Sequence, residues 1–276
     1  MSNKRVLCIQ DMSGIGRSSL TVISPVLSVK GIQCVPLPTT VLSTHFGGFG
    51  NVARQDLTQF CFDALNEYKR IGVDFDGVLS GFIASETQAQ LVKQAFDYAD
   101  AAVKICDPVM ADNGKMYSSV TDSIAEGIKQ ICYESDVITP NTTEAAILLG
   151  KDCTKLVFEK AEIENTARQL KEKYNCSVVI TGVKLENGDV VCCVAEKDTD
   201  GITFVECNYI PVHFPGTGDL FAATMTGCVL NGEKLEAAVE KACRFVEICV
   251  KNTWKGEKTD TRYGVDVEQN LRYLLD

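Results

Sequence analysis

The chain has 276 residues, of which 45% are hydrophobic and 23% charged, and its 27 basic and 37 acidic side chains give a formal net charge of −10. This acidic excess disfavours nucleic acids and anionic membrane surfaces as partners, because both bind proteins largely through basic side chains. The hydrophobic content argues against intrinsic disorder, and no apolar run reaches the length of a membrane-spanning helix. We therefore expect one folded domain over residues 1–276, with neither a membrane span nor a signal peptide.

Short β-branched runs alternate with longer amphipathic stretches, which predicts βαβ units around a largely parallel sheet. The expected strands are Arg5–Ile9, Cys34–Leu37, Gly77–Leu79, Val103–Cys106, Val137–Thr139, Ser177–Thr181, Val190–Ala195 and Ile202–Glu206. The expected helices are Ser18–Val29, Leu57–Arg70, Ser85–Tyr98, Val120–Ile131, Thr142–Leu149, Ile163–Tyr174, Asp219–Leu230, Leu235–Lys251 and a last short one at Val267–Leu274. The last two strands are predicted to form an antiparallel hairpin at one edge of the sheet.

The segment Thr39–Gly50 departs from this pattern, because strand-forming residues run into a cluster of glycines with two phenylalanines and a histidine. Aromatic and histidine side chains suit the cover of a pocket. Composition leaves two interpretations, a hairpin arm that leads into a flap or an ordinary surface loop.

The chain contains thirteen cysteines and no Cys-x-x-Cys pair. Most lie in apolar stretches, as Cys8 does, and the adjacent pair Cys192 and Cys193 would point to opposite faces of a strand. We interpret the cysteines as reduced, buried and apolar, which is typical of a cytoplasmic protein. A structural zinc site is disfavoured, because His45 and His213 are the two histidines and neither lies near a cysteine pair.

A glycine motif, Gly14-Ile-Gly16-Arg-Ser-Ser19, follows the first strand and begins a helix. A dinucleotide site is disfavoured, because Ser19 replaces the third glycine and no acidic residue ends the second strand. The motif is then a tight turn, or the floor of a small-molecule site with Asp11 just beyond the carboxyl end of the strand. No Gly-x-x-x-x-Gly-Lys-Ser/Thr sequence occurs, so a P-loop nucleotide hydrolase is excluded.

Two acidic motifs follow strands that are expected inside the sheet. Asp107 and Asp112 flank a turn after one strand, and they suit Mg²⁺ held directly or through waters beside a phosphate chain. Asn141 and Glu144 follow the next strand, where they fit a helix N-cap and its capping-box partner equally well. The carboxyl ends of parallel strands meet at one edge, so both motifs are expected close together.

The most informative motif is Gly216-Thr217-Gly218-Asp219, placed before a run of good helix formers. Successive backbone N–H groups at a helix start form a concavity that binds anions. Asp219 in the same turn is a base within reach of a hydroxyl that attacks a phosphoryl group held over those N–H groups.

In this order, Asp-Pro-Val, Thr-Pro-Asn-x-x-Glu and Gly-Thr-Gly-Asp resemble the motifs of the ribokinase-like superfamily, and within it those of the pyridoxal (vitamin B6) kinases. Ile9-Gln10, Ser43-Thr-His45 and Leu79-Ser-Gly-Phe82 match that branch in order and spacing, and the resemblance covers essentially the whole chain. It implies an α/β fold of three layers, with a mostly parallel central sheet flanked by helices, and a homodimer.

The resemblance also implies a role for each matching residue. The catalytic set is Asp219 as base, with the amides of Gly216, Thr217 and Gly218 as an anion hole. The Mg²⁺ set is Asp107, Asp112 and Glu144. The nucleotide set is Asn141, Thr181 and Tyr117. The vitamin-ring set is Asp11, His45, Phe46 and Phe82, with the flap near residues 39–50 as cover.

The implied reaction transfers the γ-phosphoryl group of ATP to the 5′-hydroxymethyl group of a B6 vitamer, with Mg²⁺ and K⁺ as candidate ions. Three departures from the family pattern concern the ring pocket: Asp11 replaces a usual Ser, Phe46 a common Thr and Phe82 a frequent Tyr. Asp11 either pairs with the substrate, with pyridoxamine slightly preferred, or caps the Gly14 turn. A hydroxymethylpyrimidine kinase of the same superfamily and a non-catalytic nucleotide or vitamin sensor stay open as alternatives.

Overall fold

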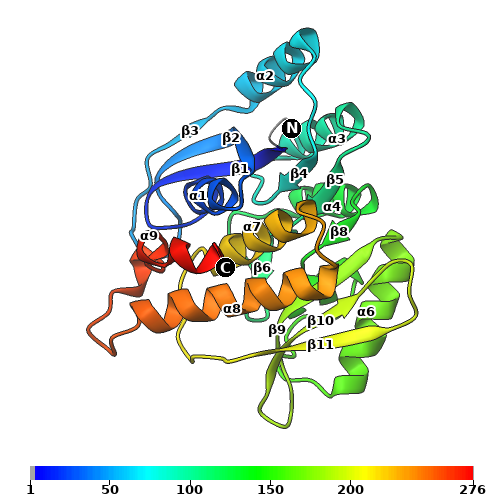
Figure 1. The fold of residues 1–276 in the computed structure, drawn as a ribbon, viewed down its shortest axis with the longest axis vertical. Coiled ribbons are helices and arrows are strands. Elements are labelled where there is room, and N and C mark those ends of the chain that lie inside the picture. The colour runs from blue at the N-terminus through cyan, green and yellow to red at the C-terminus, as the bar shows by residue number, and fades with distance from the viewer. Residues whose placement is uncertain (1–3, 276) are drawn as a thin grey trace.

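The computed structural model describes residues 4–275, which fold around one central sheet (Figure 1). Within this part of the chain the sheet has nine strands in the order β11-β10-β9-β8-β5-β4-β1-β2-β3. Their bounds are β1 Arg5–Ile15, β2 Gln33–Thr44, β3 Arg54–Asp56, β4 Gly77–Ser80, β5 Val103–Cys106, β8 Val137–Ile138, β9 Ser177–Lys184, β10 Val190–Ala195 and β11 Ile202–Cys207. A separate short hairpin is formed by β6 Ala111–Asp112 and β7 Lys115–Met116.

All neighbouring strands from β9 across to β2 run parallel. Antiparallel pairs close both edges of the sheet, β10 with β9 and β11 on one side and β3 with β2 on the other. The mostly parallel sheet and the hairpin of β10 and β11 are therefore confirmed. Because the parallel strands share one direction, their carboxyl ends lie along one edge, which is where open α/β sheets bind ligands.

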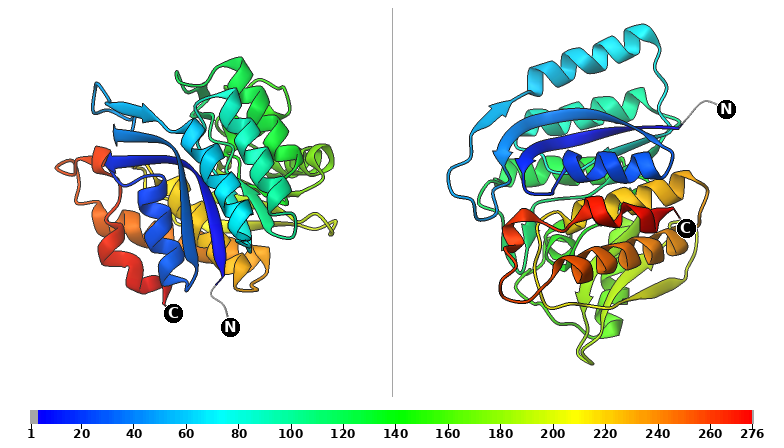
Figure 2. Two further views of the ribbon diagram at one scale, coloured as in Figure 1. Left: turned by 90° about the horizontal axis from the view of Figure 1, so that it is seen from above. Right: turned by 60° about the vertical axis from the view of Figure 1, so that its left-hand side comes forward.

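Helices cover both faces of the sheet and complete the three predicted layers (Figure 2). On one face lie α1 Leu20–Val29, α7 Thr217–Leu230, α8 Leu235–Thr253 and α9 Val267–Asn270, with 3₁₀ turns at Thr261–Tyr263 and Leu271–Leu274. On the other face lie α2 Thr58–Ile71, α3 Glu86–Tyr98, α4 Asp122–Tyr133, α5 Thr142–Leu148 and α6 Lys160–Tyr174. Over residues 4–275, no helix has both the length and the apolar character needed to cross a bilayer.

The strand β1 shows how the sheet holds the two helical layers together. Leu7 and Ile9 pack into the core beneath α2 to α6, and Val6 and Cys8 pack into the core beneath α1, α7 and α8. All four side chains are fully buried. A strand that is apolar on both faces is typical of a parallel sheet with helices on either side.

The two strands nearest the N-terminus are longer than predicted. β1 continues from the predicted end at Ile9 to Ile15, and β2 continues from Leu37 to Thr44. The added halves pair with each other beyond an irregularity after Gln10. Polar residues and glycine interrupt the apolar pattern in this part of β1. The backbone hydrogen bonds with β2 that form this half of the strand could therefore not be predicted from hydrophobic periodicity.

The structure also defines the first half of the segment Thr39–Gly50. Residues up to Thr44 belong to β2, and an irregular loop then leads to β3, which pairs antiparallel with β2. The first half of the segment is therefore the arm of a hairpin. β3, β6 and β7 were missed because strands of two or three residues are too short to show alternation.

Leu7 provides a test of the buried central layer. We expect Leu7→Ala to lower the free energy of unfolding by about 2–5 kcal/mol, because it removes apolar contacts and leaves a cavity. Leu275, which is 71% exposed, is the control, and Leu275→Ala should change stability by less than about 0.5 kcal/mol. Urea unfolding followed by circular dichroism measures both values, and an equally small effect of the two substitutions would contradict the layered core.

Candidate active site

The residues singled out in the sequence gather where the parallel strands end. Gln10 and Asp11 lie on β1, Asp107 directly follows β5, Asn141 follows β8 and Thr181 lies on β9. A parallel bridge between Asn141 and Thr181 continues the pairing of β8 with β9 beyond the named strands. The topology of the sheet therefore brings together motifs that are far apart in the sequence.

A cavity of about 260 Å³ opens at this edge, bounded by the strand ends and by helices α7 and α8. Its polar lining includes Asp107, Thr139, Thr181, Thr217 and Gly218. Its apolar lining includes Phe221, Val246 and Val250. Such a mixture suits a ligand that has both a charged part and an apolar part.

Helix α7 begins at this cavity without a side-chain cap. Gly216 is its N-cap residue, with a left-handed φ of 82°, and no side chain accepts a hydrogen bond from the first turn. A Cβ atom at Gly216 would lie 2.0 Å from the carbonyl oxygen of Arg17, so only glycine fits there. The first N–H groups of α7 have no partner within the helix, which leaves them available to an anion.

Asp219 lies in this first turn, but its carboxylate is held by another part of the chain. The Ser19 backbone N–H donates to Oδ2 at 2.8 Å, and the Gln10 Nε2 donates to Oδ1 at 3.3 Å. A Cβ atom at Gly81 would lie 1.7 Å from the Gln10 Oε1, so a larger residue there would displace the Gln10 side chain that binds Asp219. Because Asp219 does not cap its own helix, the anion site and the acid remain separate groups.

The pKa of Asp219 is raised to about 7, mainly by burial; the carboxylates of Asp11 and Asp107 contribute to the rise, and the hydrogen bonds from Ser19 and Gln10 oppose it. Burial also raises the pKa of Asp107 to about 6, against a hydrogen bond that Thr139 Oγ1 donates to its Oδ1 at 3.0 Å. Asp107 lines the cavity and Asp219 directly follows its lining residue Gly218, and acids with raised pKa values beside a cavity are typical of functional sites.

Asp11 lies on β1 and is 4% exposed, and both of its carboxylate oxygens accept hydrogen bonds. The hydroxyl of Ser19 donates to Oδ1 at 2.7 Å and the hydroxyl of Ser13 donates to Oδ2 at 3.0 Å. Burial raises the pKa of Asp11, and these two bonds lower it. Asp11 therefore binds the hydroxyls of two serines on either side of Gly14, and Gly14 itself lies on β1 rather than in a turn.

Ser19 is the residue that sequence reasoning missed. Its backbone N–H binds Asp219 and its hydroxyl binds Asp11, so it connects two buried carboxylates. Its φ of 56° and ψ of −140° lie in a region that glycine favours. Its place in a glycine-rich turn was the single available signal.

Asn141 and Glu144 form a complete capping box at the start of α5. Asn141 Oδ1 accepts from the N–H groups of Thr143 and Glu144, and the Glu144 Oε2 accepts from the Asn141 N–H. The Glu144 Oε1 accepts from the Met110 N–H at 3.0 Å. Both side chains thus fix α5 against the segment after β5, and the capping interpretation is confirmed.

The three carboxylates of the predicted Mg²⁺ set do not converge on one point. Their oxygens do not all lie within 4.8 Å of one another. In the described chain one group of three potential ligands meets that criterion, and it consists of cysteines. Asp112 lies on the β6–β7 hairpin, where its oxygens accept from the backbone and side chain of Asn113. Asp107 Oδ2 faces the start of α7, 3.9 Å from the position of a Cβ at Gly218. An all-oxygen donor set of this kind fits Mg²⁺ that keeps several of its waters.

Tyr117 directly follows β7, and its backbone N–H donates to the Met110 carbonyl oxygen at 3.0 Å. Burial raises its pKa, and the carboxylates of Glu144, Asp112, Asp107 and Asp219 raise it further, in that order. Its side chain is 41% exposed. Tyr117 is therefore within the electrostatic influence of all four acids.

The predicted ring-pocket residues divide into two groups. His45 is buried and has both ring nitrogens engaged: the Gly47 N–H donates to Nδ1 at 2.9 Å, and Nε2 lies 2.7 Å from the Arg262 carbonyl oxygen, to which it donates. Phe46 is 49% exposed, and its ring centroid lies 6.4 Å from that of Phe82. His45 thus fixes the loop after β2, while the two phenylalanines present an aromatic surface beside it.

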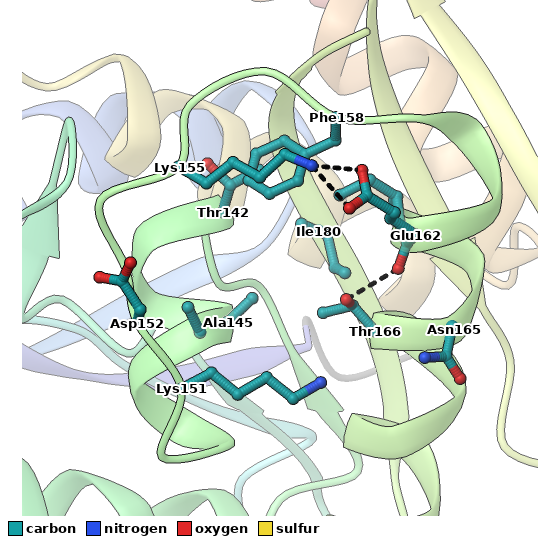
Figure 3. A pocket seen from close by; sticks show the side chains of 12 residues that line it. Thr142, Ala145, Lys151, Asp152, Lys155, Phe158, Glu162, Asn165, Thr166 and Ile180 are labelled. Carbon is teal, nitrogen blue, oxygen red and sulfur yellow. Dashed lines mark hydrogen bonds and ion pairs between the residues drawn. The ribbon is translucent and has the colours of Figure 1, made fainter.

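A second cavity, of about 240 Å³, lies between α5 and α6 (Figure 3). Lys155 on its rim is paired with Glu162 at 2.6 Å. Its lining contains none of the residues that the sequence analysis assigned to a site. We therefore place the candidate active site in the first cavity.

A family model described as phosphomethylpyrimidine kinase matches residues 59–263, well over half of the chain. The chain belongs to the phosphomethylpyrimidine kinase family. It is a kinase by this membership, and the predicted three-layer fold is the fold of its structurally known relatives.

Three of these relatives are similar over almost the whole chain. A crystal structure from Bacteroides thetaiotaomicron, assigned to the phosphomethylpyrimidine kinases and solved with pyridoxal, is 32% identical with a TM-score of 0.93, covering 99% of this chain and 96% of that one. The pyridoxal kinase of Lactobacillus plantarum is 28% identical with a TM-score of 0.89, covering 99% and 97%. The pyridoxal kinase of Ovis aries is 26% identical over 283 residues, covering 95% of this chain and 89% of that protein.

The residues of this kinase divide at the boundary of the family match. Phe82, Asp107 and Asp219 lie within residues 59–263, whereas Asp11 and His45 precede them. The groups around the start of α7 therefore come from both sides of this boundary, since Gln10 and Ser19, which bind Asp219, also precede the family match.

Ser19 provides a test of the strained turn. Ser19→Gly and Ser19→Ala both lose the hydroxyl bond to Asp11, but only glycine relieves the positive φ, so we expect Ser19→Gly to be about 1 kcal/mol more stable than Ser19→Ala. Ser18 is not among the positive-φ residues, so there glycine should be less stable than alanine by up to about 1 kcal/mol. Urea unfolding measures the four variants, and the same order at both positions would refute the strain.

Proposed function

We propose that this kinase transfers the γ-phosphoryl group of ATP to the hydroxymethyl group of a vitamin B6 vitamer. The observation that carries the proposal is the buried carboxylate of Asp219 beside the uncapped start of α7. The pyridoxal in the 32% identical Bacteroides structure and the names of the pyridoxal kinase relatives support this choice of acceptor.

In the proposed reaction Asp219 orients the acceptor hydroxyl and accepts its proton. As the oxygen of the acceptor bonds to the γ-phosphorus, the bond from that phosphorus to the β,γ-bridging oxygen breaks and ADP leaves. The N–H groups of Thr217 and Gly218 stabilise the charge that develops on the phosphoryl oxygens. With a pKa of about 7, Asp219 is a better match for proton transfer near neutral pH than an exposed aspartate.

The nucleotide is proposed to occupy the cavity between the strand ends and α8. Its phosphates would lie near Thr181 and the start of α7, and its base against Phe221, Val246 and Val250. When bound, Mg²⁺ supplies positive charge that offsets the phosphates. Asp107 would hold it through its free oxygen and through waters, with Asp112 and Glu144 acting at longer range.

The ring of the acceptor is proposed to lie against Phe46 and Phe82. Phe46 lies in the loop after β2 and Phe82 follows β4. Their rings pack together, and no other aromatic pair in the described chain links these two segments. Asp11 lies on β1, and it influences the site through Ser19, which binds both Asp11 and Asp219.

A hydroxymethylpyrimidine is the second candidate acceptor. The name of the matching family favours it, and its ring also carries a hydroxymethyl group. Asp11, His45 and Phe46 lie outside the family match, so the match constrains the phosphate groups more than the ring pocket.

A panel of pyridoxal, pyridoxine, pyridoxamine and hydroxymethylpyrimidine, each with MgATP, tests the proposal. We expect ATP consumption that depends on a B6 vitamer and exceeds that with the pyrimidine. Asp219→Ala should lower kcat by about 10²–10⁴-fold, the usual contribution of a general base.

The matched control is Asp122→Ala, since Asp122 also lies in the first turn of a helix but is exposed. Its kcat should equal that of the wild type. Turnover of the pyrimidine alone would transfer the proposal to the second acceptor. Absence of turnover with all four compounds would indicate a sensor, and an Asp219→Ala enzyme as fast as the control would remove Asp219 from catalysis.

A further inference from the structure

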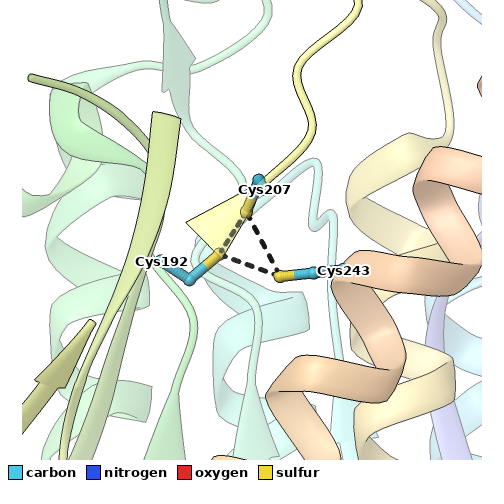
Figure 4. Close-up of side chains that lie close together, drawn as sticks. All are labelled: Cys192, Cys207 and Cys243. Carbon is cyan, nitrogen blue, oxygen red and sulfur yellow. Dashed lines mark hydrogen bonds between the residues drawn. The ribbon is translucent and has the colours of Figure 1, made fainter. Parts of the chain in front are cut away.

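Three cysteines from separate elements meet in the wall of the candidate nucleotide cavity (Figure 4). Cys192 lies on β10, Cys207 ends β11 and Cys243 lies on α8. The Sγ atoms are 3.8 Å apart between Cys192 and Cys207, 3.3 Å between Cys207 and Cys243, and 3.5 Å between Cys243 and Cys192. We call this group the thiol cluster.

The thiol cluster is not a consequence of the high cysteine content alone. Cys193 follows Cys192 in the same strand, yet it packs into the opposite core. Cys192 and Cys243 are 2% and 8% exposed, and Cys207 is half-buried. All three line the cavity, so an ion that enters the cavity can reach the sulfur atoms.

We propose that the thiol cluster is a binding site for a thiophilic cation, Zn²⁺ or Cu⁺. In a tetrahedral site with Zn–S bonds of about 2.3 Å, the sulfur atoms lie about 3.8 Å apart. The observed separations reach this value after an opening of at most about half an ångström. Thiolates select Zn²⁺ and Cu⁺, whereas Mg²⁺ prefers oxygen ligands, so the thiol cluster and the carboxylates take different ions.

Binding of the ion forms a metal–sulfur bond to each cysteine, and the displaced protons pass to solvent. In the described chain no fourth His, Cys, Asp or Glu joins the group, so the fourth position of a tetrahedral ion would take a water or a ligand from the cavity.

An ion bound to the thiol cluster would also affect the nucleotide, and this part rests on the proposed function. The same cavity of about 260 Å³ is lined by the three sulfur atoms and by Thr217, Gly218 and Asp107. An ion with a water or anion in its fourth position would occupy part of that volume. We therefore expect the ion to compete with MgATP.

The binding experiment uses the full-length, fully reduced and metal-free protein. Zn²⁺ affinity is measured by competition with a chromophoric chelator, Co²⁺ substitution by its thiolate charge-transfer absorption, and Cu⁺ in a parallel anaerobic titration. We expect one Zn²⁺ or Cu⁺ per chain, and an affinity at least about tenfold lower in Cys207→Ala and Cys243→Ala. Cys193→Ala is the matched control and should bind like the wild type.

Circular dichroism and urea unfolding establish that each variant is folded, and Cys207→Ser replaces Cys207→Ala if the latter is not. No stoichiometric binding of either ion, or equal affinity in the wild type and a folded Cys207 variant, would overturn the site. Mass spectrometry that finds a disulfide within the thiol cluster of the reduced-and-reoxidised protein, without ion binding, would overturn it in favour of a redox pair.

Kinetics test the competition separately. In the wild type, Zn²⁺ should raise the KM for MgATP while leaving kcat at saturating MgATP unchanged, and the Cys207 variant should lose this inhibition. If one Zn²⁺ binds per chain but the KM for MgATP does not change, the metal site is supported and its competition with the nucleotide is refuted. A protein that binds the ion but phosphorylates no vitamer would refute the proposed function and leave the site intact.

Discussion

Four carboxyl groups are buried at one edge of the sheet, and the rest of the candidate site depends on this burial. Burial raises the pKa of Asp219, Asp107, Glu144 and Asp11. None of the four joins an ion pair within residues 4–275, so hydrogen bonds from backbone N–H groups and hydroxyls hold them in place. Such a cluster is costly for a purely structural purpose and is favourable when a bound cation and phosphate balance its charge. The uncapped start of α7 supplies the complementary anion site in the same place.

Groups that lie within one short motif were predictable from the sequence. The Gly216–Asp219 turn, the acid after β5 and the capping box of α5 each depend on local backbone chemistry, which a few adjacent residues specify. Contacts between distant segments were not. The hydrogen bonds to Asp219 come from Ser19 and Gln10, which are 200 and 209 residues away, and no local pattern encodes such a pairing.

His45 and the thiol cluster are two further cases in which contacts between distant segments could not be predicted from the sequence. The family resemblance assigned His45 to a ring pocket, and that role stays a prediction. What the resemblance did not indicate is that its nitrogens join the loop after β2 to Arg262, which lies 217 residues away. The interpretation of the cysteines as buried apolar side chains describes most of them. It could not anticipate that the register of β10 with β11, and the packing of α8, would bring together three sulfur atoms separated by 15, 36 and 51 positions.

The central claim is that Asp219 accepts the proton of the acceptor, and that burial, reinforced by the charges of Asp11 and Asp107, keeps its pKa near neutrality. The pH dependence of kcat/KM for MgATP, which reports ionisation of the free enzyme, tests it most directly when wild type and Asp11→Asn are compared. ATP titrates identically in both assays, so the difference between the profiles belongs to the enzyme. Because Asp219 acts when deprotonated, the wild-type rate should fall as pH decreases through about 7. Removal of the negative charge of Asp11 should move that fall to lower pH, whereas two superimposable profiles would contradict the account.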